Sequence, residues 1–289
     1  PTRRSSDLVI IVFVLMLLRV NRKTDTSRTT IRLSAITDKD KIPIYYINMD
    51  KSTTRRQRME GKLRHNEPYN KRIQAVVPED LDRYEVTMGK CQSGGPALCC
   101  LLSHLKAVFT AYHDGASIAL FLEDDVEIER WPVWSSLLMT APKGWQMLRF
   151  FITSYDTLQI YGKAVNELWL ENRYGWDGCV AHIINREGME RLLESCIPQF
   201  RLLRSFSQVS KVDLTEMGNT GAACVADAGL FRLLDNDVYV CSEPLFNIEA
   251  LDSSIQTSDH LDWHRRVRDE VKTAVSYGGR RFNNFHQLS

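Results

Sequence analysis

The chain has 289 residues, of which 44% are hydrophobic and 25% charged, a composition typical of one large globular domain or two small ones. Its 37 basic side chains nearly balance 36 acidic ones, and no basic stripe is interleaved with aromatic residues, so we expect no nucleic-acid partner. The seven cysteines form no CxxC pair, which argues against a structural zinc site, and their odd number leaves at least one thiol free.

The first 40 residues differ in character from the rest. Residues 1–8 (PTRRSSDL) read like a translated sequencing-library adapter, and we expect them not to belong to the biological chain. Residues 9–18 are wholly apolar but fall short of the about 20 residues that a membrane-spanning helix needs. As the remainder of a longer segment they predict a signal anchor, with a cleaved signal peptide as the alternative. With residues 19–40 as a polar stem, we expect a single-pass type II membrane protein of the Golgi or endoplasmic reticulum, whose domain spans 41–289.

The domain is predicted to open with a strand that runs into a helix. The run KIPIYYINM at 41–49 is apolar, β-branched and aromatic, as in a buried strand. Ser52 or Thr53 can cap a helix that extends to Arg64. The following residues, 66–96, are polar and weakly patterned, and we expect a loop there.

This opening unit can bind anions. Free backbone amides at a helix start point at a ligand, and Arg55, Arg56 and Arg58 add bidentate phosphate donors. A solvated basic helix face is an equally good interpretation of Arg58 alone. Asn48 and Asp50, at the strand end, can hydrogen-bond a base or a ribose.

A second helix is predicted over 98–112 from the spacing of its apolar residues, with Gly115 just past its end. Ser103 and His104 interrupt its apolar pattern. A histidine in such a helix is more often structural than catalytic, and no acid lies one turn away to complete a nucleophilic triad. Cys100 precedes His104 by four residues, which permits a shared helix face but supplies only two ligands for zinc.

An acidic strand follows directly. The apolar run 118–122 is followed directly by three consecutive carboxylates, Glu123, Asp124 and Asp125. In an open α/β sheet, ligands bind at that end of a central strand. Adjacent acids repel one another, and their oxygens suit hard cations such as Mg²⁺ or Mn²⁺. The alternative is an acidic, solvated turn.

Strand and helix patterns alternate through the rest of the chain. Alternation of this kind predicts an α/β fold with a mainly parallel central sheet flanked by helices. The predicted elements are a helix at 131–139, strands at 145–152 and 179–185, a helix at 186–196 capped by Asn185, a strand at 237–246 and a charged helix from Asp259 onward. Asp227 and Asp213 are each either a surface cap or a general base facing a sugar acceptor.

Five segments, in this order, resemble glycosyltransferase family 25, whose bacterial members extend lipopolysaccharide and whose animal members add galactose to collagen. The resemblance covers residues 42 to about 256. It lies in YYINMDKSTTRRQRM (45–59), CLLSHLKAV (100–108), LEDDV (122–126), AHIINREGMERLL (181–193), and Asp227 ahead of Pro244 and SSI at 253–255. The chain departs from the family pattern before the second helix, where Ala97 and Cys99 stand in place of a Glu and a Gly.

The resemblance implies a GT-A-like, Rossmann-related domain that binds a UDP-sugar, UDP-galactose or UDP-glucose, and transfers the hexose with inversion to a glycan or protein hydroxyl. It implies that Glu123 and Asp125 hold Mn²⁺ (or Mg²⁺) against the donor diphosphate while Asp124 orients the donor. Asp227 would be the catalytic base, with Asp213 as the alternative. The remaining predicted donor contacts are Asn48, Asp50, Arg55, Arg56, Ser103 and His104.

Two other functions are compatible with the sequence. One is a catalytically inactive relative that binds a glycan or a partner glycosyltransferase, suggested by the departures at Ala97 and Cys99. The other is a metal-dependent phosphohydrolase, because paired aspartates after a strand suit that chemistry as well. This second alternative leaves the arginine-rich opening helix unexplained.

Overall fold

The structure is a computed structural model, and it describes residues 41–278 except 91–92, 155–156, 158–159, 162–166, 174–175, 220–224 and 250–257. The segments 1–8, 9–18 and 19–40, and the SSI at 253–255, therefore lie outside the described residues. The expected single-pass type II topology, with its Golgi or endoplasmic reticulum placement, is wrong as judged on the described ranges. No helix there is long and apolar enough to cross a membrane.

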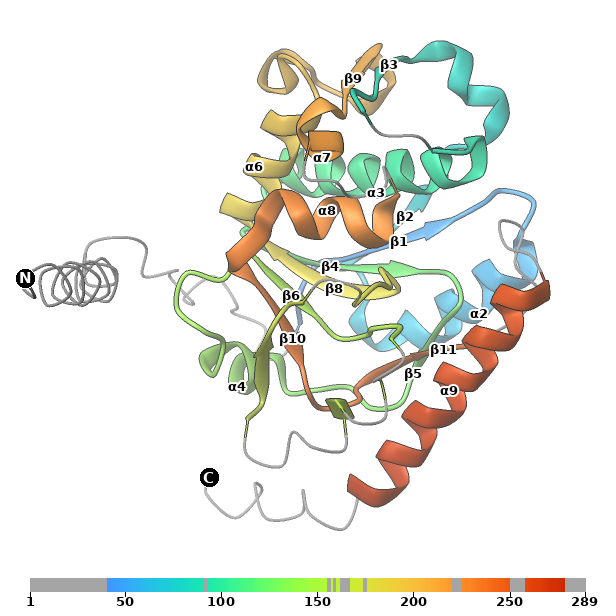
Figure 1. The fold of residues 1–289 in the computed structure, drawn as a ribbon, viewed down its shortest axis with the longest axis vertical. Coiled ribbons are helices and arrows are strands. Elements are labelled where there is room, and N and C mark those ends of the chain that lie inside the picture. The colour runs from blue at the N-terminus through green and yellow to red at the C-terminus, as the bar shows by residue number, and fades with distance from the viewer. Residues whose placement is uncertain are drawn as a thin grey trace, which may run out of the picture. The chain divides into compact units, whose positions relative to one another are not determined.

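A seven-stranded sheet organises the described residues (Figure 1). Parallel pairs join β2 to β1, β1 to β4 and β6 to β10, whereas β8 runs against both β4 and β6, and β7 runs against β10. The predicted α/β class with a mainly parallel central sheet is thus confirmed. In sheet order the strands are β2 (Asn70–Gln74), β1 (Ile44–Asn48), β4 (Ile118–Glu123), β8 (Ala181–Asn185), β6 (Met147–Arg149), β10 (Val238–Cys241) and β7 (Trp169–Glu171).

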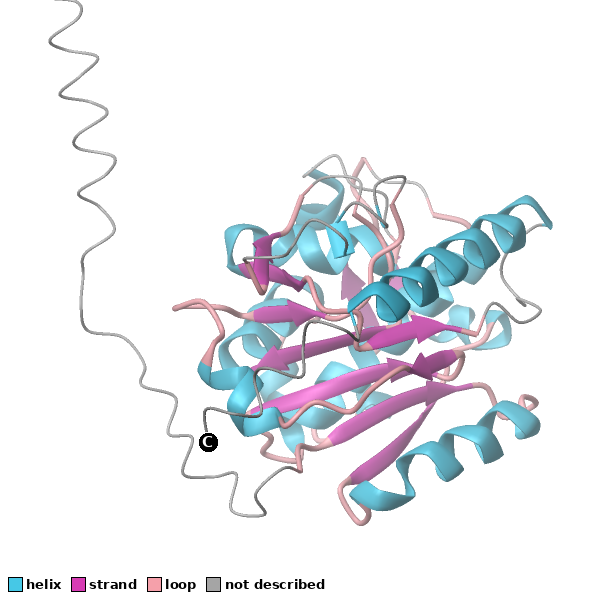
Figure 2. Cartoon of the chain, turned by 90° about the horizontal axis from the view of Figure 1, so that it is seen from below, coloured by secondary structure: helices cyan, strands magenta, loops and turns pink. Residues whose placement is uncertain are grey.

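Helices cover both faces of this sheet. Figure 1 shows α3, α6 and α8 on one face and α2 on the other, and Figure 2 shows the strands side by side. Every residue of β1 is buried, as expected for a strand with helices on both sides. The α-helices are α2 (Thr53–Leu63), α3 (Gly95–His113), α4 (Trp134–Met139), α6 (Arg186–Cys196), α7 (Thr215–Asn219), α8 (Ala226–Leu234) and α9 (Ser258–Gly278).

The helix α6 illustrates how the sequence fixes an element. Its buried residues Met189, Leu192, Leu193 and Cys196 recur at helical spacing and form one apolar face. The Asn185 side chain accepts a 2.8 Å hydrogen bond from the Gly188 amide, which confirms the predicted cap.

Two small sheets and several short helices complete the fold. Part of the stretch 66–96 that was predicted to be a loop forms strands, and that expectation is wrong. Of the five residues of β2 only Ile73 is buried, so the strand carries little apolar signal at its edge position. The remaining elements are β3 (Glu85–Thr87) paired with β9 (Lys211–Asp213), β5 (Val126–Ile128) paired with β11 (Phe246–Ile248), and the 3₁₀ helices η3 (Arg64–Asn66), η4 (Pro78–Arg83), η5 (Phe200–Leu202), η6 (Phe206–Gln208) and η7 (Asp235–Asp237).

The strand order creates a switch point beside β1. The chain leaves β1 for β2 on one side and later returns to place β4 on the other side. Rossmann-related sheets bind ligands at the carboxyl ends of the strands, beside such a reversal of strand order. Asn48 ends β1 and Glu123 ends β4 at this switch point.

Candidate functional site

The three carboxylates follow one another at the end of β4 but meet different partners. Glu123 closes the strand, and its amide donates to the Val180 carbonyl at 3.0 Å. Asp124 and Asp125 occupy the turn that leads to β5, and the Asp125 carbonyl accepts a 2.7 Å hydrogen bond from the Glu249 amide. Backbone contacts to two distant segments therefore fix this turn.

Both carboxylate oxygens of Asp124 accept hydrogen bonds. Asn48, which is 1% exposed, donates to Oδ2 at 2.7 Å, and Arg55 of α2 donates to Oδ1 at 2.9 Å. Arg72 of β2 in turn donates from Nε to Asn48 Oδ1 at 2.9 Å. Asp124 thus ties the end of β4 to β1 and α2, and its orientation is fixed.

Asp125 is the least satisfied of the three acids. Its Oδ2 lies 3.7 Å from Arg55 Nη1, while its buried Oδ1 has no hydrogen-bond partner among the described residues. Burial, and next the charge of Glu123, raise the pKa of Asp125 to about 7 despite the opposing Arg55 guanidinium. A carboxyl group with so perturbed a pKa, beside a second acid, is a candidate functional residue.

Glu123 faces the other way, toward α3. Its Oε1 lies 3.0 Å from Nε2 of His104, whose side chain is 1% exposed. The Cys100 sulfur lies one helical turn before His104 and close to both groups. Beside His104, with ring centroids 5.5 Å apart, His182 donates from Nδ1 to the Cys179 carbonyl at 3.1 Å. Burial, together with His104, holds the pKa of His182 well below its usual value, so its ring is neutral.

Ser103 has a local structural role in α3. Its hydroxyl donates to the Cys99 carbonyl at 2.7 Å and accepts from the Val76 amide at 2.8 Å. It therefore fastens the segment after β2 to α3. Its side chain is only 2% exposed, and both of these hydrogen bonds are made within the fold.

Asp50 and Arg56 lie at the exposed rim of the site. The Asp50 carboxylate accepts hydrogen bonds from Arg72 and, at 2.6 Å, from Gln74, and the Arg72 hydrogen bond lowers the pKa of Asp50. Arg56 donates to the Asp50 carbonyl at 3.3 Å. Of the arginines expected in α2, Arg55 alone is hydrogen-bonded to the acidic turn in the described contacts.

The two candidate bases occupy different environments. Asp213 ends β9, and its Oδ1 accepts from the Thr215 amide at 2.9 Å, which caps the start of α7. Hydrogen bonds from the Thr215 side chain and then from its amide lower the pKa of Asp213. Asp227 lies in the first turn of α8, and the structure describes its backbone but not its side chain. Because α8 leads through η7 into β10, its start lies at the carboxyl edge of the sheet, on the side of the acidic turn (Figure 1).

Sequence reasoning missed two arginines with many contacts, Arg72 at the site and Arg149 in the core. Arg72 was hidden in the stretch expected to be a loop. Arg149, at the end of β6, is fully buried and donates to the carbonyls of Trp176, Asp177 and Gly178 and to the Asn172 side chain, at 2.5 to 2.9 Å. Its guanidinium also lies 3.6 Å from the centroid of the Phe231 ring. No local signal in the sequence predicts either set of contacts.

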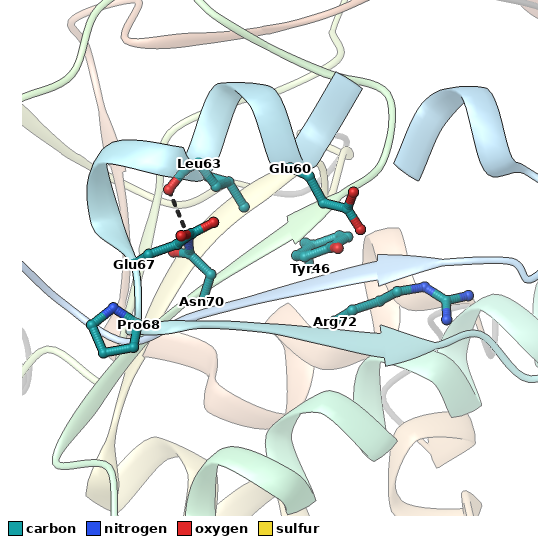
Figure 3. A pocket seen from close by; sticks show the side chains of 7 residues that line it. All are labelled: Tyr46, Glu60, Leu63, Glu67, Pro68, Asn70 and Arg72. Carbon is teal, nitrogen blue, oxygen red and sulfur yellow. Dashed lines mark hydrogen bonds between the residues drawn. The ribbon is translucent and has the colours of Figure 1, made fainter. Parts of the chain in front are cut away.

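A pocket of about 360 Å³ lies between α2 and the strands β1 and β2 (Figure 3). Arg72 is shared between its lining and the site. The pocket opens over strand residues and not over the three acids, so we do not assign it to the donor. Its lining residues are Tyr46, Glu60, Leu63, Glu67, Pro68, Asn70 and Arg72.

No family model and no curated protein matches the sequence. Among solved structures, the chain is similar to a glycosyltransferase involved in the glycosylation of the major capsid of PBCV-1, with 8% identity, 78% of this chain and 98% of that chain covered, and a TM-score of 0.33. It is also similar to glucosyl-3-phosphoglycerate synthase from Mycobacterium tuberculosis in complex with Mn²⁺, UDP and phosphoglyceric acid. That match has 11% identity and a TM-score of 0.31, and it covers 87% of this chain and 84% of the synthase chain. The same synthase with UDP-glucose gives 11% identity, 87% and 86% coverage and a TM-score of 0.31. At these values the likeness carries no argument about activity, and the family 25 resemblance stays a prediction.

Proposed function

We propose that this chain is a glycosyltransferase that moves a hexose, galactose or glucose, from a UDP-sugar to a hydroxyl group of a glycan or protein acceptor. The observation that carries the proposal is Oδ1 of Asp125, which is buried at the switch point of the sheet and has no hydrogen-bond partner in the part of the chain that the structure describes. Rossmann-related sheets bind nucleotides at such a switch point.

Asp125 fits a hard divalent cation, Mn²⁺ or Mg²⁺, because carboxylate oxygens are the ligands that such ions prefer. Glu123 is the second predicted ligand: its charge raises the pKa of Asp125, while its Oε1 contacts His104 on the α3 side. The bound cation would act as a Lewis acid toward the departing diphosphate. Asp124, already held by Asn48 and Arg55, would keep this constellation in place.

The chain's own residues supply the rest of the reaction. The acceptor hydroxyl loses its proton to a base as its oxygen attacks the anomeric carbon, and the bond to UDP breaks with inversion. We assign the base to Asp227, because α8 starts at the carboxyl edge of the sheet, whereas Asp213 is engaged as a cap. Arg55, Arg56 and Asp50 would border the diphosphate and the ribose.

The test combines binding and turnover on the full chain. Calorimetry with UDP and Mn²⁺, with and without chelator, should show binding that needs the metal. A panel of UDP-sugars should then give donor hydrolysis or transfer that falls about 100-fold in Asp125→Asn, a loss typical of one electrostatic group in an active site. The matched control is Asp82→Asn, an exposed carboxylate of η4, which should leave turnover unchanged.

Other outcomes would assign another function. Absence of UDP binding in the presence of Mn²⁺ would favour an inactive glycan- or partner-binding relative. Release of phosphate from simple phosphomonoesters would favour the phosphohydrolase. Turnover that is unchanged in Asp125→Asn would overturn the cation assignment.

A further inference from the structure

A second group of metal-ligating side chains lies on the α3 side of the acidic turn. Cys100 and His104 are four residues apart on α3, and Glu123 ends β4. One ligand atom from each of the three residues lies within 4.8 Å of the other two. The sequence supplied two of these ligands on one helix face, and the fold adds the third from a strand.

The types of ligand favour a different ion from the one expected at Asp125. A thiolate and an imidazole suit Zn²⁺ and related transition metals, whereas Mg²⁺ and Mn²⁺ prefer oxygen. Tetrahedral zinc with such ligands separates their atoms by about 3.3 to 3.6 Å, given the usual metal–ligand bond lengths. His104 Nε2 and Glu123 Oε1, 3.0 Å apart, need to separate slightly, and the distances to the Cys100 sulfur need to close by at most about 1.5 Å.

The surroundings of the group also suit a bound ion. Because α3 leads directly into β4 and runs against it, the start of the helix lies next to the strand's end. His182 pairs in register with Phe121, two residues before Glu123, so His182 lies on the same face of the sheet as Glu123. Its Nε2 is buried and has no hydrogen-bond partner among the described residues, and its ring lies 5.5 Å from that of His104.

We propose that Cys100, His104 and Glu123 form a binding site for a transition-metal ion of the zinc type, with three protein ligands and a remaining position open to water. Binding forms three metal–ligand bonds and releases the thiol proton of Cys100 to solvent. The site would join α3 to the end of β4. It shares Glu123 with the cation site of the proposed glycosyl transfer, but its three ligands can be tested without a nucleotide sugar.

The experiment uses the full chain, freed of metal by chelator and titrated with Co²⁺, which replaces Zn²⁺ and absorbs light. One equivalent of Co²⁺ should produce the near-ultraviolet charge-transfer band of a cobalt–thiolate bond. Cys100→Ser should abolish the band, and His104→Gln should weaken Co²⁺ binding at least about tenfold. The matched control is Cys99→Ser, the adjacent cysteine that does not belong to the group, which should keep the band.

A second measurement needs no variant. Zn²⁺ should protect Cys100 from alkylation in the native protein, as read by mass spectrometry of its peptide. Co²⁺ binding without the thiolate band, a band that survives Cys100→Ser, or alkylation unaffected by Zn²⁺ would overturn the proposal. No nucleotide sugar is present in either measurement, so a chain that fails to bind UDP can still support this site.

Discussion

The two sides of the acidic turn offer a cation different surroundings. Asp124 and Asp125 face β1 and α2, where their neighbours are an amide and a guanidinium. Glu123 faces α3, where its neighbours are an imidazole and a thiol. In a regular strand, residues 123 and 125 would share one face. Since β4 ends at Glu123, the turn instead gives these two acids separate partners. Acidic residues that are adjacent in sequence can therefore meet chemically different neighbours.

The largest effect is expected on the β1 side, from Asn48→Ala. This change removes the hydrogen-bond donor of Asp124 Oδ2 and the acceptor of Arg72 Nε. Both groups then lack a hydrogen-bond partner that Asn48 supplied. The free energy of unfolding should fall by about 2–3 kcal/mol in urea denaturation. Gln74→Ala, which removes only an exposed contact to Asp50, should cost less than about 0.5 kcal/mol. Equal losses in the two variants would contradict the anchoring role of Asn48.

Asp125→Asn should stabilise the protein, but only when the native residue is ionised. The folded-state pKa of about 7 lies above the ordinary value of 3.8, so the folded state retains a proton that the unfolded state loses. The unfolding free energy of the native protein therefore falls as the pH rises from about 4 to 7. At pH 8 the variant should be more stable by about 2 kcal/mol, and near pH 4 the difference should vanish. A gain that is independent of pH would show that burial does not raise this pKa.

The affinity for Mn²⁺ should depend on the same proton. Below its pKa, Asp125 must lose a proton before it can bind the cation, so calorimetry should show affinity rising about tenfold between pH 6 and 8. The pH dependence should be absent in Asp125→Asn. Mn²⁺ prefers oxygen ligands and does not need the Cys100 sulfur. Cys100→Ser should therefore leave Mn²⁺ binding at Asp125 unchanged. A flat profile in the native protein would assign the Mn²⁺ site elsewhere.

The smallest effect is expected at Asp213, which touches neither side of the turn. Asp213→Ala removes the cap of α7 and should lower the free energy of unfolding by about 1 kcal/mol. Donor turnover by the remaining folded protein should not change. Asp227→Asn, by contrast, should reduce turnover without loss of stability. A large turnover loss in Asp213→Ala would transfer the role of base to that residue.

Strongly periodic elements were predictable from the sequence, and short edge elements were not. The helices α3 and α6 and the strand β4 are long or continuous in their apolar pattern, so their positions follow from local sequence. The strand β2 is stabilised by its pairing with β1, and its own residues are mostly polar. The antiparallel direction of β8 is likewise set by the sheet and not by its apolar residues.

The site was predictable as a position and not as a set of contacts. The location of Glu123, Asp124 and Asp125 at the carboxyl end of a central strand follows from a strand pattern and a general property of α/β sheets. The direction of each side chain depends on partners distant in sequence. Asn48, for example, lies 76 residues before the Asp124 that it contacts. A single sequence contains no local signal for such pairs.

The buried Arg149 has a consequence for how this molecule could diversify. Three of its four acceptors are main-chain carbonyls of 176–178, which every amino acid carries. The path of that loop is therefore set by the arginine and not by the side chains at 176 and 177, whereas Gly178, with φ +100°, admits a side chain only with strain. The loop leads into β8, whose first residues lie beside the acidic turn. New side chains could thus be presented to an acceptor along an unchanged backbone, so that acceptor preference could drift without redesign of the fold.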